Sequence, residues 1–67
     1  MFYLILWLES ARQWHVADSV FEHTLGNATS MLRSMHPHST RPGTLWAVVH
    51  RSDLQEAMAR NPRALHV

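Results

Sequence analysis

The chain opens on a run of seven apolar residues, F-Y-L-I-L-W-L at positions 2–8, which ends at Glu9. A short apolar run of this length is typical of a β-strand, and it is far shorter than the ~20 residues that span a bilayer. Because side chains alternate across a strand, the even-numbered residues of the run share one face and the odd-numbered residues share the other. Both faces are therefore apolar, which raises the question of what covers the second one.

Two further segments have the pattern of strands. Residues 45–50, L-W-A-V-V-H, form a second run that is apolar on both faces. Residues 13–16, Q-W-H-V, follow the first run after the short polar stretch E-S-A-R and are a candidate hairpin partner for it. The turn between them lacks the Asn-Gly or Asp-Gly pair that marks tight hairpins, so it stays open whether residues 12–16 form a strand.

The spacing of the apolar residues changes to a helical period over residues 19–35. One arc of this predicted helix carries Val20, Phe21, Thr24, Leu25, Ala28, Met31, Leu32 and Met35. Ser19 and Glu22 match a capping box at its start, with Asp18 as a competing N-cap. Gly26 lies off the apolar arc, so we predict one continuous helix and leave open a break at this residue.

A second, shorter helix is predicted after the loop at 36–44, which contains two prolines and one glycine. Its start matches another capping box, formed by Ser52 and Gln55. The apolar stripe expected on it is narrow and consists of Leu54, Ala57 and Met58. Pro62 ends the helix, because the residue before a proline is disfavoured in the helical region. The last five residues, 63–67, are either a frayed tail or a short edge strand.

This order of elements predicts a single domain, residues 1–67, with a small α+β fold. We expect a two-layer α/β sandwich, in which both helices cover one face of a mostly antiparallel sheet in the order β-(β)-α-β-α, with a candidate C-terminal strand. The face expected under the helices consists of Leu4, Leu6, Leu8, Leu45, Ala47 and Val49. The face expected to stay uncovered consists of Tyr3, Ile5, Trp7, Trp46 and Val48. The alternative is that Trp14, the 36–44 loop and the tail fold back over this second face.

Charge and composition narrow the classes of function. The chain has six arginines, no lysine and a formal net charge of +1, which does not predict a broad electrostatic attraction to nucleic acid. It has no cysteine, so disulfides and thiolate zinc sites are excluded. No basic residue precedes the opening run and no small-residue cleavage site follows it. We therefore expect a cytoplasmic protein that does not enter a membrane.

Candidate chemistry is sparse. His36 and His38 are spaced so that both imidazoles could reach one metal ion, but a zinc site needs four ligands and a His-Pro-His loop is more typically solvated. There is no G-x-S-x-G motif and no glycine-rich phosphate loop. Asp53 and Glu56 are one turn apart, and their place at a helix start accounts for both charges. We predict no metal, no other cofactor and no enzymatic activity.

The predicted uncovered face carries the functional interpretation. A patch of that kind exceeds what most soluble monomers expose, and Trp and Tyr dominate the energetics of interfaces. We expect it to contact a second copy of the chain, giving a homodimer, or a larger protein or nucleoprotein complex. The predicted second contact consists of Arg33, Arg41 and Arg51. The protein would then act by occupying a surface of its partner.

Very short chains without cysteine or motif are typical of phage and mobile-element inhibitors of host machinery, including anti-CRISPR proteins. An inhibitor of this class is the expectation, and it follows from what the chain lacks rather than from any residue. One alternative is a nucleic-acid-binding regulator, in which bases stack on the aromatic sheet face beside arginines. The other is a structural subunit whose sheet belongs to a larger assembly.

Overall fold

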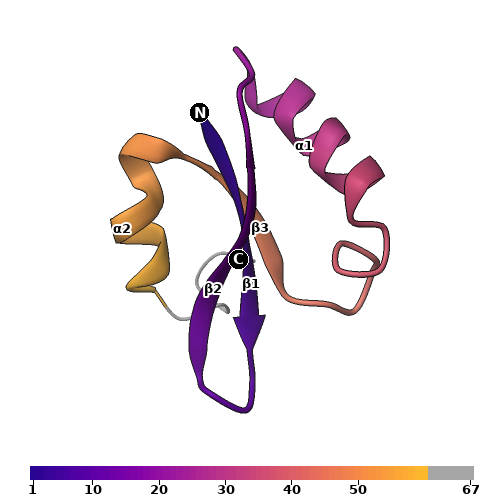
Figure 1. Ribbon diagram of the computed structural model, residues 1–67. Helices are drawn as coiled ribbons and strands as arrows, with labels where there is room; N and C mark the ends of the chain where they lie inside the picture. Colours follow the sequence, from indigo (N-terminus) through magenta and orange to yellow (C-terminus); the bar gives the residue numbers. More distant parts are fainter. Residues whose placement is uncertain (61–67) are drawn as a thin grey trace.

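The computed structural model describes residues 1–60 of the chain, which form one three-stranded sheet and two α-helices (Figure 1). In chain order the elements are β1 (Phe2–Leu8), β2 (Gln13–Val20), α1 (Leu25–Met35), β3 (Trp46–His50), the 3₁₀-helix η1 (Arg51–Asp53) and α2 (Leu54–Met58). The predicted class, a small α+β fold with an antiparallel sheet and two helices, is confirmed, and residues 13–16 do belong to a strand. The candidate C-terminal strand at 63–67 lies outside the described residues.

The opening run forms the central strand of the sheet. The strand order is β2-β1-β3, and β1 pairs antiparallel with both neighbours. A strand buried on both faces reads as a continuous apolar run, which explains why β1 lacks polar alternation. β1 and β2 are joined by a four-residue turn in which Arg12 adopts a left-handed backbone conformation with a φ of 51°.

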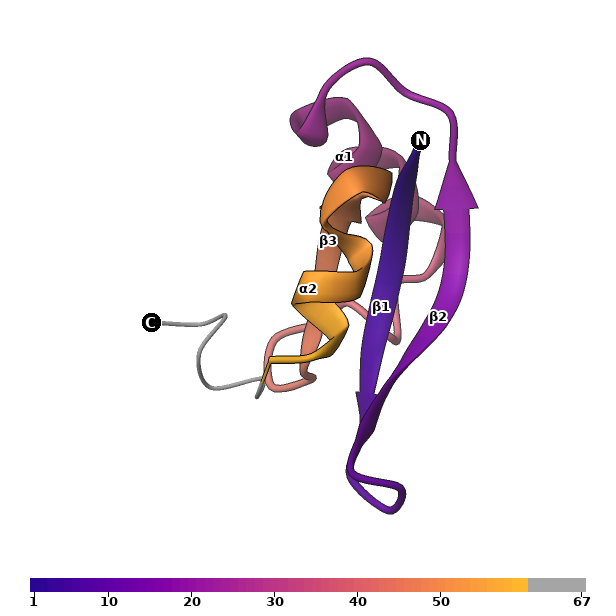
Figure 2. The same ribbon diagram turned by 90° about the vertical axis from the view of Figure 1, so that its left-hand side faces the viewer.

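The two helices lie on opposite faces of the sheet. One core cluster joins α1 to the even-numbered residues of β1, with Leu4 and Leu32 fully buried in it. A second cluster joins α2 to the odd-numbered residues, with Ile5 fully buried. Figure 1 views the sheet along its edge, with α1 on one side and α2 on the other, and Figure 2 shows α2 in front of the sheet. The prediction that both helices share one face is therefore wrong, because a central strand that is apolar on both faces needs a cover on each.

The register of β3 differs from the predicted one by one residue. Trp46 lies opposite Leu6 and Val48 opposite Leu4, so both side chains point to the α1 face. In the predicted register, Trp46 and Val48 share a face with the odd-numbered residues of β1. A slip of one residue moves every side chain of a strand to the other face, and a strand that is apolar on both sides carries no pattern that fixes the choice.

A β-bulge in β2 decides which face Trp14 joins. Leu4 lies opposite Asp18 and Ile5 opposite Val16, so Ala17 is an extra residue on the β2 side. Without it, alternation from the far end of β2 would place Trp14 on the α1 face. With it, Trp14 points to the α2 face, where it is buried.

The first helix begins later than predicted. Residues 18–20 pair with β1, and Val20 is buried in the α1-side core, so the capping box at Ser19 and Glu22 does not form. The helix instead begins after Thr24, whose hydroxyl oxygen accepts a hydrogen bond from the amide of Asn27 at 3.2 Å. Gly26 lies in the first turn of this helix, so no break occurs in mid-helix.

The second helix also starts differently. The imidazole Nδ1 of His50 accepts the amide hydrogen of Ser52 at 3.1 Å and lies 2.8 Å from its hydroxyl. This contact caps η1, and α2 follows without a side-chain cap, so the predicted pairing of Ser52 with Gln55 is absent. The predicted apolar stripe is confirmed, since Leu54, Ala57 and Met58 all pack into the α2-side core.

Candidate functional site

The five residues predicted as an interface are divided between the two faces of the sheet. Tyr3, Ile5 and Trp7 point to the α2 face, whereas Trp46 and Val48 point to the α1 face. Ile5 is fully buried and the other four are half-buried. The structure therefore does not bring these five residues together, and neither face is left uncovered.

Trp14 and α2 together cover the face that was predicted to be open. The rings of Trp7 and Trp14 meet edge to face, with 5.5 Å between their centroids. The indole N–H of Trp14 donates to the backbone oxygen of Arg60 at 2.9 Å, which ties the end of α2 to β2. One alternative from the sequence places Trp14 over this sheet face. The sequence does not predict α2 on the same face, because the narrow apolar stripe of α2 can pack against either side of the sheet.

Two of the three arginines predicted as a second contact lie together. Arg33 and Arg41 line a groove of about 480 Å³, here called the arginine groove. Its other lining residues are Ser30, Ser34, Pro37, Thr40 and Pro42. The guanidinium of Arg33 lies over the ring of Trp46, 6.0 Å from its centroid. Arg51 follows the opposite end of β3 and does not line this groove.

The loop that carries Arg41 is held by its own hydrogen bonds. Thr40 is buried, and its hydroxyl donates to the backbone oxygen of His36 at 2.8 Å. The hydroxyl of Thr44 donates to the backbone oxygen of Arg41 at 2.6 Å. Gly43, with a φ of 94°, supplies the left-handed turn between them that other residues rarely adopt. Arg41 is thus presented from a fixed loop.

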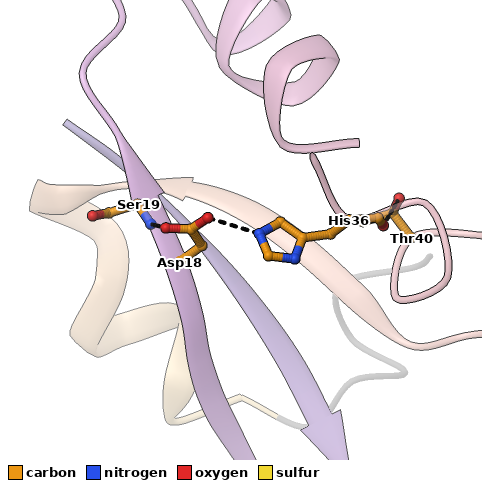
Figure 3. Close-up of polar contacts among 4 residues, drawn as sticks. All are labelled: Asp18, Ser19, His36 and Thr40. Carbon is orange, nitrogen blue, oxygen red and sulfur yellow. Dashed lines mark hydrogen bonds and ion pairs between the residues drawn. The ribbon is translucent and has the colours of Figure 1, made fainter. Parts of the chain in front are cut away.

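The two histidines considered as metal ligands have separate roles. The Nε2 atom of His36 lies 2.7 Å from a carboxylate oxygen of Asp18, and the other carboxylate oxygen accepts the amide of Ser19 at 2.7 Å (Figure 3). The hydrogen bond from His36, followed by that from Ser19, holds the pKa of Asp18 below its usual value. His38 lines a different groove. Within residues 1–60 no three His, Cys, Asp or Glu side chains are grouped as a metal site would require.

An apolar groove that the sequence pattern does not predict lies where β1 ends. Its volume is about 460 Å³, and we call it the apolar groove. Its lining consists of Leu6, Trp7, Leu8, Glu9, His38, Ser39, Gly43, Thr44 and Leu45. Leu8 is 38% exposed and Leu45 is 39% exposed, although both belong to strongly apolar runs. Leu8 is the last residue of β1 and Leu45 precedes β3, so both lie beyond the last β1–β3 pair, Leu6 with Trp46, and the sequence carries no signal of where that pairing ends.

The walls of the apolar groove are polar at the rim. The indole N–H of Trp7 donates to the carboxylate of Glu9 at 2.8 Å, which fixes that ring beside the two leucines. His38 and Thr44 lie on the side formed by the loop. An apolar floor with a polar rim is the general anatomy of a protein-binding patch.

A third groove lies beside α2 and carries net negative charge. Its volume is about 280 Å³ and its lining consists of Val49, Asp53, Glu56, Ala57 and Arg60. Glu56 and Arg60 form an ion pair one helical turn apart, which leaves the charge of Asp53 unbalanced within the groove. We call this the acidic groove.

Further apolar side chains are exposed at the start and along the flank of α1. Phe21, between β2 and α1, is 82% exposed, and Leu25, Met31 and Met35 are also exposed. None of the three grooves described above includes these residues in its lining.

Comparison of the chain with protein-family models, curated proteins and solved structures finds no significant match. Over the described part of the chain, neither helix has the length and apolar character needed to cross a membrane.

Proposed function

We propose that the protein is a small, non-catalytic binding protein that acts by occupying a surface of a larger protein or nucleoprotein complex. The observation that carries the proposal is the apolar groove, in which Leu8 and Leu45 are exposed beside the fixed ring of Trp7. An apolar pocket rimmed by polar groups favours an aromatic or aliphatic anchor from a partner, and such anchors supply most of the energy of protein interfaces.

The proposed setting is the cytoplasm, as predicted from the sequence, and inhibition of host machinery by a phage or mobile element stays a prediction. Homodimerisation was predicted from an uncovered aromatic face, and α2 now covers that face. Base stacking on the same face, which the nucleic-acid alternative requires, would need α2 to leave the sheet. The proposal therefore rests on the groove and not on the sheet face.

The test uses site-specific photo-crosslinking in the organism that encodes the protein. Leu45 is replaced by the photoreactive p-benzoylphenylalanine, and Gln55, an exposed residue of α2, is replaced in a matched control. We expect one defined partner to crosslink from position 45 and not from position 55. The change Leu8→Asn should abolish that crosslink, because it makes the floor of the groove polar while the residue stays partly exposed.

Two outcomes contradict the proposal. The first is equal crosslinking from positions 45 and 55, which would mean that the groove has no special contact. The second is a crosslink from position 45 that survives Leu8→Asn with unchanged yield in a folded variant.

A further inference from the structure

The outer edge of β3 has backbone groups that the described chain does not use. The pairing of Leu6 with Trp46 and the hydrogen bond from the amide of Trp7 to the oxygen of Leu45, at 3.0 Å, fix the phase of the ladder. In an antiparallel pair this phase directs the backbone groups of Ala47 and Val49 toward β1. The backbone groups of Trp46 and Val48 and the amide of His50 then point outward, and no hydrogen bond to them is found within residues 1–60, whereas the carbonyl of His50 opens the first turn of η1.

The two edge strands of the sheet differ in whether they carry features that disfavour pairing with another strand. β2 carries the bulge at Ala17 and the carboxylate of Asp18, and bulges and charges are devices that discourage the addition of another strand. β3 pairs with β1 in five consecutive positions without a bulge, and it contains no proline and no Asp, Glu, Lys or Arg. Figure 2 shows β3 and β2 as the two outer strands of the sheet. Of the two edges, β3 is the one suited to accept a strand.

Charges of opposite sign flank this edge on the two faces of the sheet. On the α1 face, Arg33 lies over Trp46 and shares the arginine groove with Arg41. On the α2 face, Val49 opens into the acidic groove, where Asp53 and the Glu56–Arg60 ion pair give a formal charge of −1. A strand added to β3 would direct alternate side chains to these two faces.

We propose that the outer edge of β3 binds an extended segment of a partner protein by strand addition, with acidic side chains directed to the arginine groove and basic side chains to the acidic groove. Backbone hydrogen bonds supply affinity in this mode, and the flanking grooves supply specificity. The two flanking grooves share no lining residue with the apolar groove, and the experiments below test strand addition without the crosslink at Leu45.

The first experiment measures amide hydrogen exchange by NMR in the free, full-length protein. We expect the amide of Val48 to exchange about tenfold faster or more than those of Ala47 and Val49, since exchange reports which amides are hydrogen-bonded. The flanking amides serve as internal controls. Equal protection of all three would mean that the edge is already paired, either within the chain or with a second copy, and would overturn the proposal.

The second experiment titrates a defined probe, the blocked hexapeptide E-K-V-T-E-K. In an extended conformation its glutamates share one face and its lysines the other. The matched control peptide, E-E-V-T-K-K, has the same composition but mixes the charges on each face. We expect the first peptide to shift the amide signals of Trp46, Val48 and His50 and to bind several-fold more tightly than the control. Equal binding of the two peptides, or shifts centred elsewhere, would overturn the proposal.

The variants Arg33→Gln and Arg41→Gln should each weaken the probe several-fold, whereas Arg12→Gln, in the turn between β1 and β2, should leave it unchanged. Testing two arginines keeps the result interpretable if loss of the Arg33 contact perturbs Trp46. A probe methylated on alternate backbone nitrogens should not bind, because it cannot complete the ladder. Unchanged binding of the methylated probe would exclude strand addition.

Discussion

The two faces of the sheet are closed by different means. On the α1 face an eleven-residue helix lays Ala28 and Leu32 on the aliphatic residues of β1, and it is fixed by a side-chain cap at Thr24. On the α2 face the helix has five residues and no side-chain cap, and Trp14 supplies the bulk that the helix lacks. A short amphipathic helix can therefore cover a sheet face when a tryptophan from a neighbouring strand completes the layer.

The difference predicts where each layer is weakest. The α1 layer depends on aliphatic packing along the helix, because its two buried helix residues have no polar contact to the sheet. The α2 layer depends on the indole ring of Trp14 and on the hydrogen bond that its N–H donates to the backbone oxygen of Arg60, at 2.9 Å. Both layers share β1, so a large defect in either should reach the whole domain, whereas small defects should stay on one side.

The largest effect is expected from Leu32→Ala. Leu32 is fully buried, and truncating a buried leucine lowers the free energy of unfolding by about 3 kcal/mol through lost transfer energy and the cavity left behind. A domain of this size is marginal, so much of the variant should be unfolded at room temperature. Urea denaturation followed by circular dichroism measures the change.

The neighbouring residue of α1 provides the control for that prediction. Met31 is 41% exposed, and Met31→Ala should lower the free energy of unfolding by about 0.5 kcal/mol or less. Equal losses for the two variants would mean that the helix does not pack on the sheet through Leu32.

The second prediction concerns the α2 layer. Trp14→Phe keeps an aromatic ring but removes the indole N–H and part of the ring volume, which should lower the free energy of unfolding by about 1–2 kcal/mol. Amides of α2 should lose protection from exchange before those of α1, because the lost hydrogen bond held the end of α2. Trp7→Phe removes a hydrogen bond to the exposed carboxylate of Glu9 and part of the volume of a ring that is only half-buried, so it should change stability less. Equal loss of protection in both helices would show that the layers do not open separately.

Much of this architecture could be predicted from the sequence. The two apolar runs, the helical period around Ala28 and Leu32, and the narrow stripe on the second helix all form the expected elements. The faces could not be assigned, because both runs are apolar on each side and no polar residue marks an outward position. The bulge at Ala17 has no sequence signal of its own, and it is this residue that sends Trp14 to the α2 face.

The candidate site was predicted less well for the same reason. The predicted interface residues all lie on one sheet face only in the predicted register of β3. The observed register differs by one residue and places Trp46 and Val48 on the opposite face. Arg33 and Arg41 were found because loop and helix positions do not depend on that register. The apolar groove depends on where strand pairing stops, which is a tertiary property of the ends of β1 and β3.

The third prediction compares the two helix starts. Thr24→Ala removes the hydroxyl that accepts the amide of Asn27 and should lower the free energy of unfolding by about 1 kcal/mol. Asp53 stands at the N-cap of α2 without a side-chain hydrogen bond, so Asp53→Ala should cost about 0.5 kcal/mol or less through the helix dipole alone. Chemical denaturation of both variants measures the difference, and a larger loss for Asp53→Ala would reverse the assignment of which helix is capped.

The smallest effect is expected from the polar contact that ties the end of α1 to β2. The hydrogen bonds from His36 and Ser19 hold the pKa of Asp18 below its usual value in the folded state, so the unfolded chain binds more protons in acid. The stabilisation is fully present above the unfolded pKa of the carboxyl group, and it is lost as the pH falls through the folded pKa. Unfolding free energies measured across the acid range should therefore decline more steeply for the parent protein than for Asp18→Asn.

The partner side of the same contact gives the matched variant. His36→Ala removes the larger cause of the lowered pKa of Asp18 and leaves the hydrogen bond from the amide of Ser19 in place. It should therefore remove most, but not all, of the extra decline of the unfolding free energy in acid. Because both changes act on one interaction, the double variant should lose little more than Asp18→Asn alone. Additive losses would mean that the two side chains stabilise the α1 layer separately, and the contact in Figure 3 would then not couple the helix to β2.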